Sequence, residues 1–381
     1  MKILHISDLH IGLKLYNRDL GEDQRYILEQ ITDQARTWQP GAVVIAGDIY
    51  DKAEPTIEAV TLFDYFIGSL TEAVPEAEIM IISGNHDSAG RMNLYRSILK
   101  KQRVHVIGLP PMQPEEHIER VTLQDEYGSV DFYLLPFVKP TMVKAIVGTD
   151  SKGCNLSYNE SVHRLIERED MDLSRRNVLV SHQFYNPVGC DADQVERADS
   201  EIRSVGNIDE VKADILDRFD YAALGHIHKP WPLDEFHRYC GTPLACSVSE
   251  AGQEKGSILV TLGPKGEIST RVLPLIPLRA IRSLTGTLDE ICAQACDDYV
   301  TVMITDPEST DFLSMRDRLH MAFPNLLDYG AAAAAEADIE FTPEEMPEKD
   351  PYTLCTDFLS DLTEDQQALL ADIINTVKGV E

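Results

Sequence analysis

Residues 221–230 read YAALGHIHKP, a short apolar run that stops at a glycine and is followed by two histidines. A run of this length between turn residues is typical of a buried β-strand, which we expect to end near residue 226. His226 and His228 are separated by one isoleucine at the point where the chain must leave the sheet. They are either half-exposed polar residues of a loop or two imidazoles that point into one site and bind a metal.

Similar apolar runs alternate with segments of helical spacing along the first two thirds of the 381-residue chain. Residues 25–38 and 57–70 have the helical spacing. Strands that alternate with helices predict a layered α/β domain with a largely buried sheet. The further runs that predict strands are KILHI (2–6), AVVIAG (42–47), EIMIIS (78–83), VDFYLLPF (130–137), NVLVSH (177–182), RYCGTPLA (238–245) and GSILVTL (256–262).

The pattern changes near Pro274, so we assign residues 1–274 to the first domain. Residues 275–335 predict a small α+β domain, with helices at 288–297 and 311–323 and strands before, between and after them. Residues 336–350 are acidic and contain prolines, which indicates a linker.

Residues 351–381 predict a tail of two short helices, the second opened by the capping-box spacing of Thr363 and Gln366. One face of the tail is apolar. This face either packs on the body of the same chain or docks on another protein, and the acidic linker before it favours docking. The candidate contact residues are Leu354, Phe358, Leu369, Leu370, Ile373 and Ile374.

The formal net charge of −30 argues against a nucleic-acid partner, because phosphate binding requires Lys and Arg. Binding depends on local patches, however, and residues 88–114 contain no Asp or Glu. This basic segment is equally compatible with a solvated helix face and with contacts to phosphates. Its cations are Arg91, Arg96, Lys100, Lys101 and Arg103.

Two features favour a cytoplasmic location. The N-terminus leads directly into a predicted strand and lacks the regions of a signal peptide. The seven cysteines are odd in number and form no CxxC pair, which suits reduced thiols. No apolar run approaches the length needed to span a membrane.

Five of the predicted strands end in groups that can ligate a metal. Because sites in open α/β sheets form at the carboxyl ends of strands, we expect these groups to converge. Carboxylate, carboxamide and imidazole ligands without a thiolate suit Mn²⁺, Fe²⁺ or Zn²⁺. Their number suits two ions that share a carboxylate, and two ions can support an in-line displacement at phosphorus. The groups are Asp8 and His10, Asp48 and Asp51, Asn85, His86 and Asp87, His182, and His226 and His228.

The motifs SDLH, GDIYD, GNHD, SH and GHIH, in this order over residues 1–262, resemble those of the calcineurin-like metallophosphoesterase family. The resemblance implies helices around a central β-sandwich and two metal-binding sets. One set would be Asp8, His10, Asp48 and His228, and the other would be Asp48, Asn85, His182 and His226, with Asp48 bridging.

In that family's manner, His86 would stabilise the developing charge and protonate the leaving oxygen after a metal-bound hydroxide attacks the phosphodiester. Asp51 is the candidate to orient His86. Asp51 and Asp87 are otherwise compatible with a supporting role behind the metal ligands or with a helix N-cap.

The chain further resembles the SbcD family of bacterial exonuclease subunits over nearly its whole length, through residues 203–230, residues 238–262 and the order of the later units. This implies a Mn²⁺-dependent DNA nuclease that cuts duplex ends and hairpins in DNA repair and recombination. It also implies a homodimer that binds two copies of an SbcC-like ABC-type ATPase through the C-terminal tail. Residues 275–335 would be the DNA-capping domain, although the run Ala331–Ala335 departs from the polar residues expected there.

Two other functions are compatible with parts of the sequence. A stand-alone phosphodiesterase for small substrates would use the same metal centre, but would need neither the capping domain nor an apolar tail. A metal-binding scaffold would need no proton donor, so the presence of His86 argues against it.

Overall fold

The computed structural model describes residues 1–94, 96–186, 201, 210–306 and 312–331. The chain divides into two compact units, of which the first comprises Met1–Asp150 and Asn155–Ala332. The fold and the site described below belong to this unit. The linker, the tail and its candidate contact residues, and the alanine run after Ala331 lie outside the described residues.

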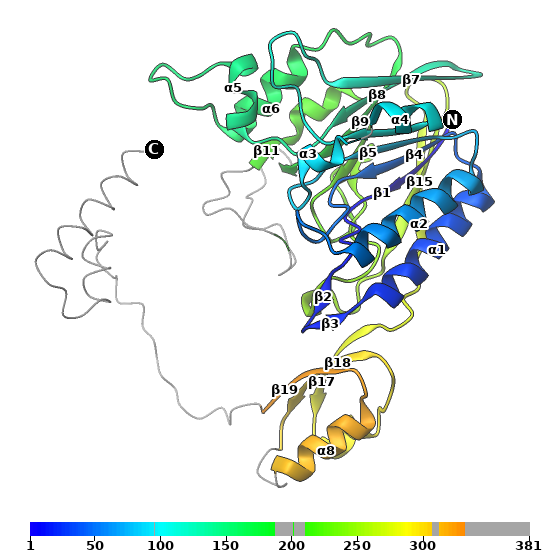
Figure 1. Ribbon diagram of the computed structural model, residues 1–381, viewed down its shortest axis with the longest axis vertical. Coiled ribbons are helices and arrows are strands. Elements are labelled where there is room, and N and C mark those ends of the chain that lie inside the picture. The colour runs from blue at the N-terminus through cyan, green and yellow to red at the C-terminus, as the bar shows by residue number, and fades with distance from the viewer. Residues whose placement is uncertain (95, 187–200, 202–209, 307–311, 332–381) are drawn as a thin grey trace, which may run out of the picture. The chain divides into compact units, whose positions relative to one another are not determined.

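Two six-stranded sheets form the centre of the unit (Figure 1). In spatial order, the first contains β16 (Ile268–Pro274), β15 (Gly256–Leu262), β1 (Lys2–Ile6), β4 (Ala42–Ala46), β5 (Glu78–Ile82) and β6 (Val104–Ile107). The second contains β13 (Trp231–Pro232), β14 (His237–Tyr239), β12 (Tyr221–Gly225), β9 (Arg176–His182), β8 (Gly128–Leu135) and β7 (Glu119–Asp125). The four strands from β1 to β6 are parallel, as are the four from β14 to β8, and antiparallel strands lie at the edges.

Alternate residues of the central strands enter two different cores, because successive side chains of a strand point to opposite faces. On β4, Ala42, Val44 and Ala46 pack in the core between the sheets, whereas Val43 and Ile45 pack against helices. Both faces are therefore buried, which explains why these strands are continuous apolar runs rather than alternating ones.

Helices cover the outer face of each sheet. The first sheet is covered by α1 (Gly21–Trp38) and α2 (Ile57–Ala73), which lie side by side in Figure 1. The outer face of the second is covered by α5 (Pro140–Val147), α6 (Tyr158–Glu167) and the 3₁₀ helix η4 (Ala213–Arg218). The prediction of a layered α/β domain with helices around a β-sandwich is confirmed.

The remaining elements before residue 280 are short and lie in connections. They are β2 (Lys14–Leu15), β3 (Arg18–Asp19), α3 (Ala89–Met92), α4 (Arg96–Leu99), η1 (Lys100–Gln102), β10 (Phe184–Asn186), β11 (Glu210–Lys212) and η5 (Val248–Glu250).

The described residues between 281 and 331 form a small three-stranded sheet with two helices and a hydrophobic core of its own. Its elements alternate as β17 (Ile281–Gly286), α7 (Leu288–Cys292), β18 (Tyr299–Ile304), α8 (Phe312–Ala322) and β19 (Leu326–Ala331). The three strands are parallel and lie in chain order, so the unit is built from two consecutive β-α-β crossovers. The helix expected at 288–297 ends earlier, at Cys292.

The β17–β19 unit is joined to α1 by a buried polar contact. Arg279 Nη1 donates to Asp23 Oδ2 at 2.8 Å, and the Tyr299 hydroxyl donates to the same oxygen at 2.9 Å. Leu15 and Leu20 pack with Ile281 in a small apolar cluster beside this contact. Among the described helices, none combines the length and the apolar composition that crossing a membrane requires.

Candidate metal centre

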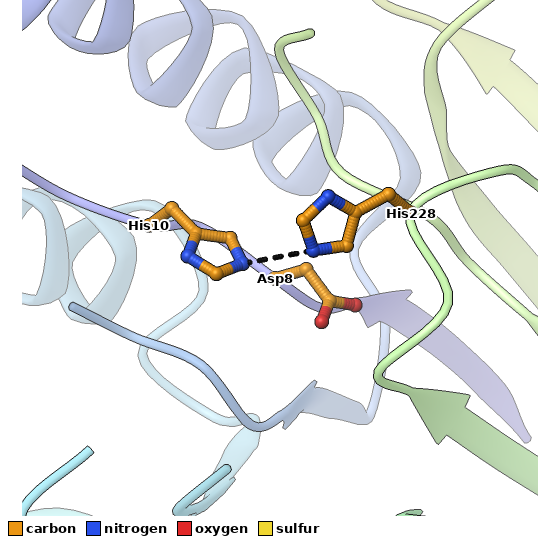
Figure 2. Close-up of side chains that lie close together, drawn as sticks. All are labelled: Asp8, His10 and His228. Atoms are coloured by element: carbon orange, nitrogen blue, oxygen red, sulfur yellow. Dashed lines mark hydrogen bonds between the residues drawn. The ribbon is translucent and has the colours of Figure 1, made fainter. Parts of the chain in front are cut away.

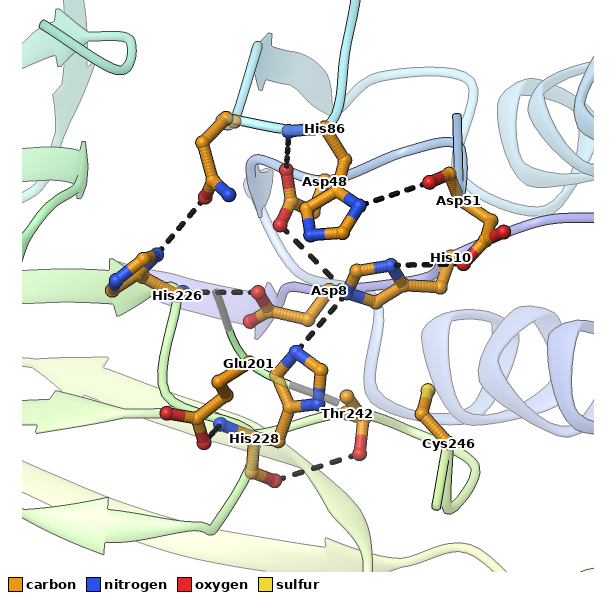
Figure 3. Close-up of polar contacts among 12 residues, drawn as sticks. Asp8, His10, Asp48, Asp51, His86, Glu201, His226, His228, Thr242 and Cys246 are labelled. Atoms are coloured by element: carbon orange, nitrogen blue, oxygen red, sulfur yellow. Dashed lines mark hydrogen bonds and ion pairs between the residues drawn. The ribbon is translucent and has the colours of Figure 1, made fainter. Parts of the chain in front are cut away.

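The polar groups at the carboxyl ends of β1, β4, β5, β9 and β12 converge. Figure 3 shows those that follow β1, β4, β5 and β12. Hydrogen bonding between the first two strands continues into their loops, since the Asp8 N–H donates to Gly47 O and the His10 N–H donates to Asp48 O, both at 3.0 Å. Single ligand atoms of Asp8, Asp48 and His182 all lie within 4.8 Å of one another. Residues from both sheets therefore meet in one site.

Four residues at this site have a positive φ angle, a backbone conformation that residues other than glycine rarely adopt. The φ angles are 53° at Asp8, 42° at His10, 49° at Asp48 and 100° at His226. A positive φ angle at such a residue costs conformational free energy, and residues with this strain cluster at functional sites.

Close packing also explains two of the motif glycines. A Cβ atom at Gly84 would lie 2.1 Å from Asp48 Oδ1, and one at Gly225 would lie 2.0 Å from Ala46 O. Any side chain at either position would push the GDIYD loop away from the GNHD or GHIH loop.

Asp8, His10 and His228 form the first candidate set, and their side chains point toward one another in Figure 2. The two imidazole Nε2 atoms are 3.2 Å apart. Two ligands that are each about 2.1 Å from one ion, at roughly right to tetrahedral angles, lie about 3.0–3.4 Å apart. Asp8 Oδ2 is buried and has no hydrogen-bond partner among the described residues. The donor set therefore fits a divalent ion.

Asn85, His182 and His226 form the second set with Asp48. His182 Nδ1 donates to Ala46 O at 2.7 Å, which leaves Nε2 as an acceptor. This acceptor lies 3.0 Å from Asn85 Oδ1 and 3.3 Å from Asp48 Oδ2. His226 Nδ1 lies 3.0 Å from the same Asn85 oxygen. With Nε2 deprotonated, the His182 nitrogen and the Asn85 and Asp48 oxygens are near enough to one another to ligate a single ion, so this set also fits a divalent ion.

Asp48 lies between the two sets. Its Oδ2 atom is 3.7 Å from His10 Nε2 and 3.3 Å from His182 Nε2. The structure thus brings together all seven predicted ligands, with the predicted bridging carboxylate at the centre.

Burial and neighbouring charges shift the titration of these groups. Burial acts to raise the pKa of Asp48, but the adjacent His182 and His10 outweigh it and hold that pKa well below its usual range. For His182, burial favours the neutral ring, but Asp48 raises the pKa to about 9. Burial raises the pKa of Asp8 to about 6. A divalent ion would favour ionised Asp8 and neutral His182, so ion binding would release protons here.

His86 lies beside the two sets and is half-buried. Its backbone N–H donates to Asp48 Oδ1 at 2.9 Å, and its Nδ1 donates to the backbone carbonyl of Asp51 at 2.9 Å. The predicted contact between Asp51 and His86 therefore runs through the backbone. The Asp51 carboxylate instead lies 3.9 Å from His10 Nδ1.

Three further residues support the site from outside it. Asp87 accepts hydrogen bonds from the backbone N–H groups of Ile49, Tyr50 and Gly84, and so ties the GNHD loop to the GDIYD loop. Gln24 of α1 donates to His10 O at 2.7 Å. Glu250 lies behind His228. The sequence marks Asp87 through its motif, but nothing local marks Gln24 or Glu250.

The basic segment at 88–114 is largely neutralised by carboxylates from elsewhere in the chain. Arg91 pairs with Glu54, Arg96 and Lys100 pair with Glu119, and Arg103 pairs with Glu76, at 3.0–3.3 Å. Lys101 is exposed. The local absence of acidic residues therefore does not produce a strongly positive surface.

Comparison with known proteins places this site in a family. The family model for calcineurin-like phosphoesterases matches residues 1–230. Among solved structures, TT1561 of Thermus thermophilus is similar at 13% identity, with 71% of this chain and 98% of that chain covered and a TM-score of 0.41. GAP50, the anchor in the inner membrane complex of Plasmodium, is similar at 11% identity, with coverages of 88% and 98% and a TM-score of 0.37. The match over residues 1–230 contains every predicted metal ligand, and the chain belongs to the calcineurin-like phosphoesterase family.

Proposed function

We propose that this phosphoester hydrolase is a DNA nuclease subunit of the SbcD type, which cuts duplex ends and hairpins with two Mn²⁺ ions. The observation that carries the proposal is the double ligand set with His86 beside it. We further propose a cytoplasmic location, in line with the cysteine pattern.

The residues would share the chemistry as follows. Asp8, His10 and His228 would hold one ion, Asn85, His182 and His226 the other, and Asp48 both. Two ions bound there activate water as a nucleophile and offset the charge that develops at phosphorus.

His86 would supply the proton for the leaving oxygen. Because its Nδ1–H is held by the Asp51 carbonyl, the ring can give up a proton only from Nε2. The donating species is therefore the imidazolium.

The assembly belongs to the same proposal. Ile57, Val60, Leu94 and Ile98 are exposed apolar side chains at the start of α2 and around α3 and α4. The Arg91–Glu54 pair brings α3 close to the segment before α2. Exposed apolar side chains of this kind support an interface, and we propose that they contribute to the contact of the homodimer. The apolar positions of residues 351–381 support docking to an SbcC-like ATPase, and residues 275–335 would cap the DNA.

One observation favours a second candidate, a phosphodiesterase for small substrates. Four of the five cations of the basic segment are paired with carboxylates, and the chain carries a net charge of −30. A small diester needs no extended positive surface, whereas DNA would then require cations from the ATPase partner.

The test is a cleavage assay with Mn²⁺ on linear duplex DNA and on a chromogenic phosphodiester. We expect His86→Ala to reduce cleavage about 10²–10⁴-fold, the usual contribution of a general acid, while Mn²⁺ binding is retained. His117→Ala is the matched control, because this side chain is 56% exposed and lies outside both sets. Turnover of the small diester alone, with or without the ATPase, would favour the second candidate. Equal rates in wild type and His86→Ala would remove His86 from the mechanism.

A further inference from the structure

A buried carboxylate lies behind His228, on the side away from the first candidate set. Glu250 is 1% exposed, and its Oε1 atom is 3.6 Å from His228 Nδ1. This is the distance of an ion pair when the ring is protonated. The opposite ring nitrogen, Nε2, faces His10 (Figure 3). When His228 ligates through Nε2, Nδ1 must carry the proton, and the Glu250 carboxylate lies beside that nitrogen.

Glu250 is itself held in place by four donors. Its Oε2 atom accepts from Lys255 Nζ at 2.7 Å and from Thr242 Oγ1 at 2.9 Å. Its Oε1 atom accepts from the Cys246 N–H and from Ser247 Oγ, both at 3.1 Å. Burying a carboxylate costs free energy unless its oxygens accept hydrogen bonds, and both oxygens of Glu250 do so.

The side chain of Lys255 contacts the backbone of the same histidine. The Lys255 side chain is buried, and its Nζ donates to His228 O at 2.9 Å as well as to Glu250. The Thr242 N–H donates to the same carbonyl at 3.1 Å. The Glu250–Lys255 pair therefore contacts His228 at both its ring and its backbone.

His228, Cys246 and Glu250 also lie close enough together to suggest a third cation site. The ammonium group of Lys255 argues against this, because it is 2.7 Å from the Glu250 carboxylate and would repel a metal ion. The group instead has the arrangement of a carboxylate that supports a metal-ligating histidine from outside.

We propose that Glu250 and Lys255 are positioning residues, which fix the orientation of His228 and thereby the affinity of the first set for its ion. The proposal rests on the proposed function only in that His228 holds a metal. It predicts that the pair acts on one ion and leaves the ion held by Asn85, His182 and His226 in place.

The test is calorimetric titration of Mn²⁺ into metal-free protein, with the thermal unfolding of each metal-free variant recorded in parallel. Glu250→Gln should weaken binding of one ion about 10–100-fold and leave the other within about twofold. Because this variant leaves the Lys255 ammonium without its counter-ion, the double variant Glu250→Gln/Lys255→Met removes both buried charges and should show the same selective loss.

Glu169→Gln is the control, since Glu169 is also a buried carboxylate that accepts a backbone N–H, but it lies outside both sets. Unchanged affinities in both Glu250 variants would overturn the proposal, and so would an equal loss in Glu169→Gln. Wild-type protein that binds no Mn²⁺ would remove the metal centre itself. Wild-type protein that binds two ions but cuts no DNA would contradict the nuclease assignment and leave this inference standing.

Discussion

Asp48 is the residue on which both candidate sets depend, whereas Asn85 belongs to one. We expect Asp48→Asn to weaken binding of both Mn²⁺ ions at least about 10-fold, because the amide loses the charge that both ions would share. Asn85→Ala should weaken only one. Equilibrium dialysis followed by metal analysis distinguishes these outcomes. Loss of a single ion in Asp48→Asn would show that the carboxylate does not bridge.

The ligands were predictable because each lies within four residues of a strand end, so a local pattern marks it. Glu250 has no such mark: it ends the short 3₁₀ helix η5, away from any predicted strand end, and comes close to His228 only in the folded chain. The basic segment at 88–114 was misjudged for the same reason, because its partners also come from distant parts of the chain. Its carboxylate partners Glu54, Glu76 and Glu119 lie outside residues 88–114, so the charge of that window alone gave the wrong impression of the surface.

Among the elements, most of the buried strands were predicted to within about two residues, because two covered faces leave a continuous apolar run. The buried strand β6 was not predicted, and the strand expected at 238–245 ends at Tyr239. The edge strand β16 was not predicted, since most of its residues are partly or fully exposed and its apolar pattern is weak. Helix α1 begins at Gly21, four residues before the expected start. Its first turn contains Glu22 and Asp23, and Asp23 is buried by its contacts with Arg279 and Tyr299 rather than by an apolar face.

One ion pair ties the β7–β8 hairpin to the start of β9. Arg176 donates to Asp125 Oδ2 at 3.0 Å and to Gly128 O at 2.7 Å, and its side chain is 4% exposed. This guanidinium holds the pKa of Asp125 well below its usual range. A lowered folded-state pKa means that the contribution to stability is present above the unfolded value of about 4 and is lost as the pH falls below it.

We therefore expect Asp125→Asn to lower the free energy of unfolding by about 1–3 kcal/mol at pH 7. The difference from wild type should shrink as the pH falls from about 4 toward 2, because over this range the Asp125 carboxyl takes up a proton in the unfolded chain before it does so in the folded protein. Urea unfolding at several pH values measures this. Asp33→Asn is the control, because Asp33 is 71% exposed in its ion pair. A difference that stays constant with pH would contradict the ionic origin.

For the whole molecule, the question is what holds the β17–β19 unit against the sandwich. Asp23 is 1% exposed and depends on Arg279 for its charge compensation, and the 3₁₀ helix η5, which carries Glu250, packs near β17 through Val248 and Ile281. Loss of the Arg279 contact should therefore loosen the junction and, through η5, the support of His228.

We expect Arg279→Ala to destabilise the protein by about 1–3 kcal/mol, since it leaves a buried carboxylate with only the Tyr299 hydroxyl. Proteolysis should become faster between residues 274 and 281, and one Mn²⁺ affinity should fall in the same direction as in Glu250→Gln. Arg36→Ala is the control on α1, where an exposed pair contributes about 0–1 kcal/mol. Faster proteolysis with unchanged Mn²⁺ affinity would show that the junction is structural and that η5 holds Glu250 independently of it.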